Sequence, residues 1–184
     1  MKKAIFVHGY TSSPTRKKYQ LIGQELERLG IEYAIPAFPG ERHPDHKQWL
    51  SIIDQEVTTS KHPVILVGHS LGTRAVLLYL DQFDRHIAAA VLIAAFNNKV
   101  TDREEGYANF FEYPVDVQRV KSRADTFVVA HSIDDDAIPY HEGEEISKEL
   151  GARFIPYQGM EHFSGEERAE ENAKEFLNII TSVL

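Results

Sequence analysis

A serine between two glycines, in Gly-His-Ser-Leu-Gly at 68–72, is the residue of this chain best placed to do chemistry. Four apolar residues at 64–67 precede the motif, and a mostly apolar helical pattern follows it at 73–80. A strand, a sharp turn and a helix are the context in which Gly-x-Ser-x-Gly presents a nucleophilic serine. The glycines leave room for the turn, and the first amides of the helix would face an oxyanion at Ser70. The alternative is a glycine-rich turn in which Ser70 only caps the helix.

A nucleophilic serine needs a base to take its proton and a carboxylate to orient that base. In hydrolases with this kind of turn, the acid and then the histidine follow the serine along the chain. His162 is the candidate base, because it lies in the loop after the last expected strand; the alternative is a loop histidine ordered by Glu161. Asp134, Asp135 and Asp136 are the candidate acids, and their spacing alone does not choose among them. Each could instead close a turn or cap the next helix.

We expect two further histidines to have structural roles. His8 ends an apolar run just before a glycine, where it would brace its loop, and His69 cannot turn back to the hydroxyl of its neighbour, so we expect it to pack. A metal site built from His131 and the aspartates at 134–136 has suitable donor atoms. Consecutive residues rarely point at one ion, so we expect no metal.

Apolar runs and helical periodicity alternate along the chain, which predicts a parallel sheet with right-handed crossovers and helices on both faces. In such sheets ligands bind at the carboxyl ends of the strands. The length predicts a single domain over residues 1–184. Strands are expected at 3–8, 31–35, 64–67, 87–95, 126–130 and 153–157, and helices at 16–29, 45–59, 73–80, 140–150 and 166–184.

Composition narrows the class of protein. The net charge of −8 disfavours binding to phosphate backbones, so we expect no nucleic-acid partner. No cysteine is present, which removes thiol chemistry and disulfides. The apolar run near the amino terminus stops at His8, too soon for a signal peptide, and no run reaches membrane-spanning length. We therefore expect a cytoplasmic protein with no membrane contact.

An irregular, polar stretch at 96–124 lies where a short cap-like insertion would sit. It contains an aromatic cluster at 107–113, which would either line a substrate pocket or cover the core. Phe110 and Phe111 in the insertion, with Phe38 in the opposite loop, are the candidate substrate contacts.

Four motifs together resemble a known family. They are Val-His-Gly at 7–9, Gly-His-Ser-Leu-Gly at 68–72, His-Ser-x-Asp-Asp-x-x-Ile-Pro at 131–139 and Gly-x-x-His-Phe at 159–163. Over nearly its whole length the chain is similar to the small α/β-hydrolase serine hydrolases, which include the YdeN-type bacterial proteins and the retinoblastoma-binding serine hydrolase. The resemblance implies a compact α/β-hydrolase fold, an α/β class with about six parallel strands in the order 2-1-3-4-5-6.

The resemblance also implies a site. The family's acid lies four residues before the proline, which is Asp135 here, although this chain has Asp136 where proline usually follows the acid. The family's oxyanion donors would be the amides of Leu71 and Tyr10, with Thr11 as the alternative to Tyr10. The implied activity is cleavage of small or medium carboxylic esters, or amides, through an acyl-enzyme and without a cofactor. Protein-binding roles attributed to the family leave a second reading, a hydrolase-shaped binding module with a protein partner and little turnover.

Overall fold

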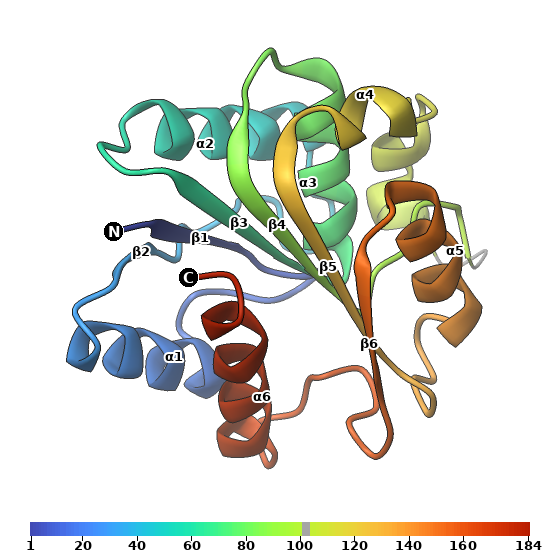
Figure 1. Cartoon of the computed structure of the whole chain (residues 1–184). Helices are drawn as coiled ribbons and strands as arrows, with labels where there is room; N and C mark the ends of the chain where they lie inside the picture. Colours follow the sequence, from blue (N-terminus) through green and yellow to red (C-terminus); the bar gives the residue numbers. More distant parts are fainter. Residues whose placement is uncertain (101–103) are drawn as a thin grey trace.

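One six-stranded sheet organises the computed structural model, which describes residues 1–100 and 104–184 (Figure 1). Every paired neighbour runs parallel, and the strand order β2-β1-β3-β4-β5-β6 confirms the expected order. The strands are β1 (Lys3–Val7), β2 (Glu32–Ala34), β3 (Val64–His69), β4 (Ile87–Ile93), β5 (Ala124–Ser132) and β6 (Arg153–Tyr157).

Helices cover both faces of this sheet. The helices are α1 (Lys17–Arg28), α2 (His46–Thr58), α3 (Leu71–Gln82), α4 (Val117–Lys121), α5 (Tyr140–Leu150) and α6 (Ala169–Thr181), with a short 3₁₀ segment η1 (Glu104–Phe111). Figure 1 shows α1 and α6 together on one side, and their apolar residues share one core cluster. Apolar residues of α2, α3, α4 and α5 form the second cluster on the other side.

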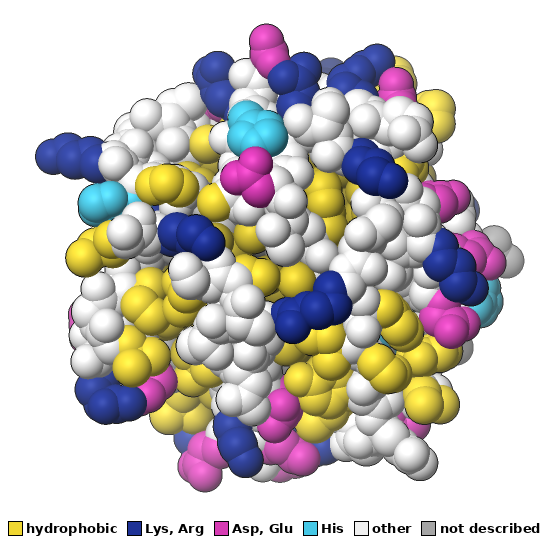
Figure 2. Space-filling view, in the orientation of Figure 1, with side chains coloured by type: hydrophobic (Ala, Val, Ile, Leu, Met, Phe, Trp, Pro, Cys, Tyr) yellow, Lys and Arg dark blue, Asp and Glu magenta, His cyan; other side chains and the backbone are white. Residues whose placement is uncertain are grey.

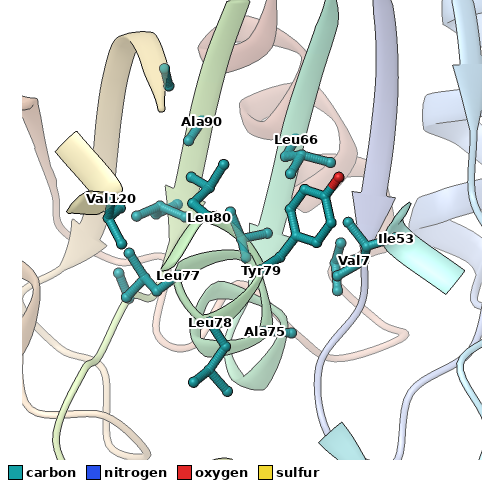
Figure 3. Close-up of a cluster of buried hydrophobic side chains, with 14 of the residues drawn as sticks. Val7, Ile53, Leu66, Ala75, Leu77, Leu78, Tyr79, Leu80, Ala90 and Val120 are labelled. Atoms are coloured by element: carbon teal, nitrogen blue, oxygen red, sulfur yellow. The ribbon is translucent and has the colours of Figure 1, made fainter. Parts of the chain in front are cut away.

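The central strands send alternate side chains into the two clusters. In β1, Ile5 joins the cluster under α2 and α3, whereas Ala4 and Phe6 join the cluster under α1 and α6. Figure 3 shows side chains of α3 packed over the sheet beside Leu66 of β3. Each fully buried large aliphatic side chain stabilises the fold by about 1.5–3 kcal/mol. Burial on both faces therefore holds the strands in one register, and with them the loops at their carboxyl ends.

Two helix ends have residue types that favour those positions. The Asp45 carboxylate accepts a hydrogen bond from the Gln48 amide at 3.0 Å, so Asp45 caps α2. Gly151 ends α5 in the left-handed region, with a φ of 66°. A side-chain cap of this kind contributes about 1 kcal/mol.

The expected insertion at 96–124 is tied to the helix that follows Ser70. Residues 101–103 of it lie outside the described residues. The buried Arg74 of α3 donates from Nε to the Phe110 carbonyl at 2.9 Å and from Nη2 to the Tyr113 carbonyl at 2.8 Å. It also donates to the Asn97 side chain. Burial lowers the pKa of Arg74 to about 10, and its hydrogen bonds hold the insertion against α3.

The surface carries mixed charge. Figure 2 shows one face of the described chain, on which basic and acidic side chains are interspersed. This face therefore offers no continuous basic strip of the kind that a phosphate backbone requires. Within the described residues, none of the helices has the length and apolar character needed to span a bilayer.

Candidate active site

Ser70 sits in a strained turn between β3 and α3, as its two glycines predict. Its φ is 54° and its ψ is −124°, a conformation that costs a non-glycine residue about 1–3 kcal/mol. A Cβ on Gly68 would lie 2.8 Å from the Gly72 carbonyl oxygen, and a Cβ on Gly72 would lie 2.0 Å from the Val7 carbonyl oxygen. Both positions must be glycine, because only then can α3 begin this close to β1 and β3. The Ser70 amide donates to the Ile93 carbonyl at 3.0 Å, which holds the strained residue in place.

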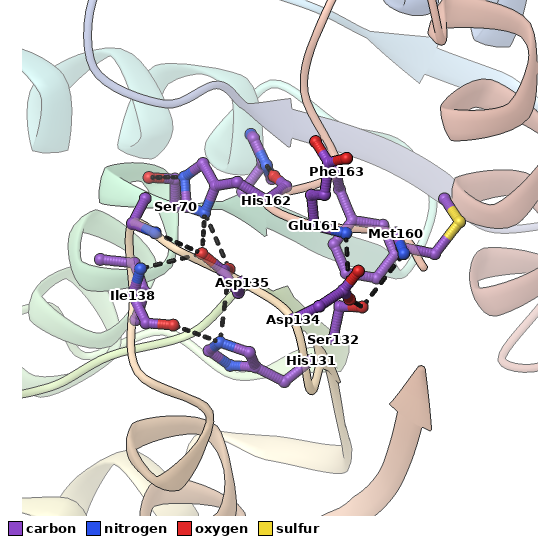
Figure 4. Close-up of polar contacts among 12 residues, drawn as sticks. Ser70, His131, Ser132, Asp134, Asp135, Ile138, Met160, Glu161, His162 and Phe163 are labelled. Carbon is purple, nitrogen blue, oxygen red and sulfur yellow. Dashed lines mark hydrogen bonds and ion pairs between the residues drawn. The ribbon is translucent and has the colours of Figure 1, made fainter. Parts of the chain in front are cut away.

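A continuous hydrogen-bonded line joins Ser70, His162 and Asp135 (Figure 4). The Ser70 Oγ lies 2.9 Å from His162 Nε2, and His162 Nδ1 lies 2.9 Å from Asp135 Oδ2. An ionised carboxylate can only accept, so Nδ1 carries the proton that it donates. In the neutral imidazole, Nε2 is then free to accept from the Ser70 hydroxyl.

Asp135 is held as an anion although its side chain is buried. Its side chain has no exposed surface, and Oδ1 accepts hydrogen bonds from the amides of Ala137 and Ile138, both at 2.9 Å. The Nε2 of His131 lies 3.4 Å from Oδ2. Burial acts to raise the pKa of Asp135, but the hydrogen bonds from His131, His162 and the Ile138 amide outweigh it and hold that pKa well below its usual range.

The two neighbouring aspartates have other surroundings. Asp134 Oδ1 accepts from the Ser132 hydroxyl and from the amides of Gly159 at 3.0 Å and Glu161 at 3.3 Å. The bonds from Gly159 and Glu161 tie the end of β5 to the loop that carries His162. The pKa of Asp134 is lowered, chiefly by the hydrogen bond from the Ser132 hydroxyl. Asp136 is exposed, and no hydrogen bond of its side chain is found within the described residues.

The residues on both sides of His162 have strained backbone conformations, and two side chains bind the carbonyl oxygens of this loop. Glu161 has a φ of 47° and Phe163 a φ of 52°, so both lie in the left-handed region. His69 donates from Nε2 to the carbonyl oxygen of His162 at 2.8 Å, and Lys18 donates from Nζ to the carbonyl oxygen of Phe163, also at 2.8 Å. Burial lowers the pKa of His69 well below its usual value, so the ring is neutral and keeps a single proton for this bond.

A cavity of about 430 Å³ opens beside the Ser70 hydroxyl. Of the two expected oxyanion donors, Tyr10 lines this cavity from the loop after β1, and Leu71 directly follows the lining residue Ser70 at the start of α3. In the described part of the chain, neither backbone amide donates a hydrogen bond to a protein group. The N–H of each amide is therefore not used within the described part of the chain, as the proposed role of an oxyanion donor requires. The cavity is lined by Gly9, Tyr10, Thr11, Ser12, Arg16, Lys18, His69, Ser70, His162, Ser164, Gly165 and Glu166.

Comparison with known proteins decides the family. The sequence profile of the serine hydrolase family matches residues 4–174. The chain belongs to this serine hydrolase family. It is 24% identical over 168 residues to the putative hydrolase YdeN of Bacillus subtilis (strain 168), which covers 90% of this chain and 88% of YdeN. It is also 24% identical over 185 residues to the serine hydrolase RBBP9 of Rattus norvegicus, covering 99% of this chain and 95% of RBBP9.

Solved structures show the same fold. The crystal structure of the ydeN gene product from B. subtilis superposes with a TM-score of 0.87 at 23% identity, covering 100% of this chain and 98% of that one. A structure from a study of carboxylesterases of the Thaumarchaeon Nitrososphaera gargenis superposes with a TM-score of 0.75 at 13% identity, covering 99% and 90% of the two chains. The α/β-hydrolase fold expected from the sequence motifs is therefore confirmed.

The aromatic residues expected at the substrate pocket lie elsewhere in this serine hydrolase. Phe110 has no exposed surface and packs edge-on against Trp49 in the core. Phe111 is half-buried, with the Arg74 guanidinium 5.0 Å from its ring centre. Phe38 is buried against Trp49 and lines a groove next to the cavity. None of these three phenylalanines is among the described residues that line the cavity beside Ser70, because their rings pack against Trp49 or Arg74 instead.

His8 braces its loop, as its position before Gly9 predicts. Its Nδ1 donates to the Gly9 carbonyl at 2.9 Å, and its Nε2 accepts from the Phe38 amide at 3.2 Å. Burial lowers the pKa of His8, so the ring stays neutral and can make both bonds. His131 is likewise used within the fold, because Nε2 also lies 3.1 Å from the Ile138 carbonyl oxygen.

Two residues of the site were not predicted from the sequence. Lys18 lies in the apolar stripe of α1 together with Ile22 and Leu26, four and eight residues further on. A lysine on the buried face of a helix can mark a functional site, because charged residues are rarely fully buried unless they have a partner. His69 was expected to pack, and its ring does lie 5.6 Å from that of Phe176, but its bond to the His162 carbonyl adds a positioning role that the sequence does not reveal.

Proposed function

We propose that this serine hydrolase cleaves small carboxylic esters through an acyl-enzyme formed on Ser70. The observation that carries the proposal is the Ser70 Oγ to His162 Nε2 distance of 2.9 Å, with the opposite nitrogen of the same ring 2.9 Å from Asp135. A base within hydrogen-bonding reach of a hydroxyl, and itself oriented by a carboxylate, is the arrangement that activates a serine.

In the acylation step, Ser70 Oγ attacks the ester carbonyl carbon while its proton moves to His162 Nε2. The carbonyl oxygen becomes an oxyanion, which the Leu71 and Tyr10 amides stabilise. The buried Asp135 carboxylate stabilises the imidazolium that forms beside it. Collapse of the intermediate breaks the bond to the alkoxy oxygen, which leaves as the alcohol with the proton from His162.

In the deacylation step, a water molecule takes the place of the alcohol. His162 removes a proton from the water, the resulting hydroxide attacks the acyl carbon, and the same two amides stabilise the second oxyanion. The bond to Ser70 Oγ then breaks, and the serine regains its proton from His162. The products are a carboxylic acid and the free enzyme, so no cofactor is consumed. The cavity of about 430 Å³ favours small esters over long acyl chains.

The test is the Ser70→Ala variant, compared with Ser51→Ala as a matched control at an exposed serine of α2. We expect Ser70→Ala to fold normally but to lose roughly a millionfold in turnover of p-nitrophenyl acetate, and to lose labelling by a fluorophosphonate probe. Ser51→Ala should behave like the wild type. Labelling of the Ser70→Ala protein at the wild-type rate would overturn the proposal, as would a folded wild-type protein that ignores both the probe and a panel of esters.

A further inference from the structure

The wall of the cavity beside Ser70 is polar, although esterase pockets are often apolar. None of its described lining residues has an aliphatic side chain without a polar group. Its lysine, arginine and carboxylate side chains are Arg16, Lys18 and Glu166. Arg16 and Glu166 neutralise each other, because their side chains form an ion pair of 3.3 Å. Lys18 is thus the one cation on the described wall that has no matching carboxylate.

Lys18 is buried, with 6% of its surface exposed. Its Nζ is 2.8 Å from the Phe163 carbonyl oxygen and 3.4 Å from His69 Nδ1, which is an acceptor in the neutral ring. It also lies 4.8 Å from the centre of the Phe176 ring. Within the described residues, no carboxylate forms an ion pair with it. Burial of an ammonium without a carboxylate is costly, and an anionic ligand would offset that cost.

The ammonium group and the nucleophile belong to residues that line the same cavity. His69 Nδ1, which is 3.4 Å from Lys18 Nζ, lies 3.5 Å from the position that a Cβ on Gly9 would occupy. That same position is 3.1 Å from the Ser70 Cβ. The His69 ring and the backbone of Gly9 therefore lie between the ammonium and Ser70, and all four residues line the same cavity, so a ligand that fills it can contact both Lys18 and Ser70.

The start of α1 adds to the positive potential of this wall. The helix has twelve residues, no acidic residue in its first turn and no side-chain cap at Arg16. The positive end of its dipole therefore lies at the cavity, next to Lys18, and favours a negative charge there. The Glu166 carboxylate also lies at this helix end, where it accepts a long bond of 3.4 Å from the Lys17 amide and pairs with Arg16.

We infer that Lys18 recognises a carboxylate on the substrate, and that the preferred substrates of this serine hydrolase are hemiesters of short dicarboxylic acids. The inference rests on the proposed esterase function and names its substrate class. The free carboxylate of the hemiester pairs with the Lys18 ammonium while the ester carbonyl lies at Ser70. Hydrolysis then adds one water and releases the dicarboxylate and the alcohol.

The test compares two esters of the same shape. Monoethyl succinate carries the carboxylate, and ethyl isocaproate replaces it with an uncharged isopropyl group. We expect the wild-type protein to prefer monoethyl succinate in kcat/KM, and the Lys18→Met variant to lose that preference by roughly ten- to a hundredfold, the range for a hydrogen bond to a charged group. Lys17→Met, at an exposed lysine paired with Glu170, is the matched control and should keep the preference.

The pH dependence gives a second readout. Burial lowers the pKa of Lys18 to about 7, while Glu166 acts to raise it and Arg16 to lower it; His69 and His8 are the other titratable groups that it influences. The charged form binds the carboxylate, so the KM for monoethyl succinate should rise as the pH passes through about 7. The KM for ethyl isocaproate should show no such rise, and Lys18→Met should remove the difference between the two esters.

The outcomes separate this inference from the proposed function. An equal loss on both esters in Lys18→Met would mean that the lysine only braces the Phe163 carbonyl, and would overturn the inference while leaving the esterase intact. A wild-type protein without preference for monoethyl succinate would do the same. Binding is also measured without turnover, by calorimetric titration of the Ser70→Ala protein with succinate. Binding there that is lost when Lys18→Met is added supports the inference, and its absence overturns it, whatever the outcome of the esterase assays.

Discussion

His69 donates a hydrogen bond to the backbone oxygen of His162 over 2.8 Å, so the residue directly before Ser70 holds the residue whose imidazole contacts Ser70. The link matters because Glu161 and Phe163, on either side of His162, both have left-handed backbone conformations. Each such conformation costs about 1–3 kcal/mol and persists only where the surroundings hold it. His69 therefore helps to position the candidate base His162 by binding its backbone carbonyl oxygen.

We expect His69→Phe to lower kcat for p-nitrophenyl acetate by roughly ten- to a hundredfold with little change in KM, because a shift of about 1 Å at the base has that effect. The phenyl ring keeps the packing against Phe176 but lacks the donor. His69→Gln supplies an amide donor at a similar reach and should recover much of the loss. Steady-state kinetics with urea unfolding curves checks this. A folded His69→Phe protein with wild-type kcat would contradict the positioning role.

The three consecutive aspartates offer a second prediction with its own controls. Asp135→Asn keeps the shape but removes the charge next to His162, and an amide would favour the wrong tautomer of the ring; we expect kcat to fall by about ten-thousandfold. Asp134→Asn weakens the bonds that the amides of Gly159 and Glu161 make, so it should lower the urea midpoint of unfolding, with a smaller loss of kcat than Asp135→Asn. Asp136→Asn should behave like the wild type.

Kinetics and urea unfolding of these three variants, made side by side, measure the expected order. A greater loss of kcat in Asp134→Asn or Asp136→Asn than in Asp135→Asn would reassign the acid to that position.

The fold and the position of Ser70 could be predicted because they depend on local sequence rules. The backbone is restricted locally by the apolar runs of the strands and by the glycines at 68 and 72, and the structure has the predicted strands and turn there. Strand order followed from the resemblance, and the sheet confirms it.

Side-chain direction within loops could not be predicted in the same way. Three neighbouring aspartates at 134–136 have the same chemistry, and only the tertiary contacts distinguish Asp135, which points to His162, from Asp134, which points to the backbone of the next loop. For the same reason, an aromatic cluster looks alike whether it lines a pocket or covers a core. Phe110 belongs to the core: its side chain is fully buried, and its carbonyl oxygen accepts a hydrogen bond from Arg74 of α3, which holds the insertion against that helix.

Lys18 is the clearest case of a site residue that the sequence pattern conceals. Helical periodicity places it on the inner face of α1, yet a lysine there is easily taken for a residue whose head group reaches the solvent. Its actual partners come from β3 and from the loop before α6, which are distant in the sequence. Only their meeting at the cavity makes the lysine a candidate for binding.

Burial of Lys18 also predicts how the stability of the protein changes with pH. Its pKa is about 7 in the folded chain, against about 10.4 for an ordinary lysine in the unfolded chain. Between these values the unfolded chain binds one more proton than the folded chain, so this group makes the free energy of unfolding increase as the pH rises. Below the folded pKa both states are protonated, and the full cost of burying the charge is present.

Lys18→Met removes this group and keeps a side chain of similar length. We expect the free energy of unfolding of the wild type, relative to that of the variant, to rise by about 1.4 kcal/mol per pH unit between about pH 7.5 and pH 9. Urea unfolding of both proteins at several pH values measures the difference, and the buried tyrosines and histidines that the two proteins share cancel in it. Lys17→Met is the control and should follow the wild type. Parallel pH profiles for the wild type and Lys18→Met would show that Lys18 titrates at the same pH in the folded and the unfolded chain.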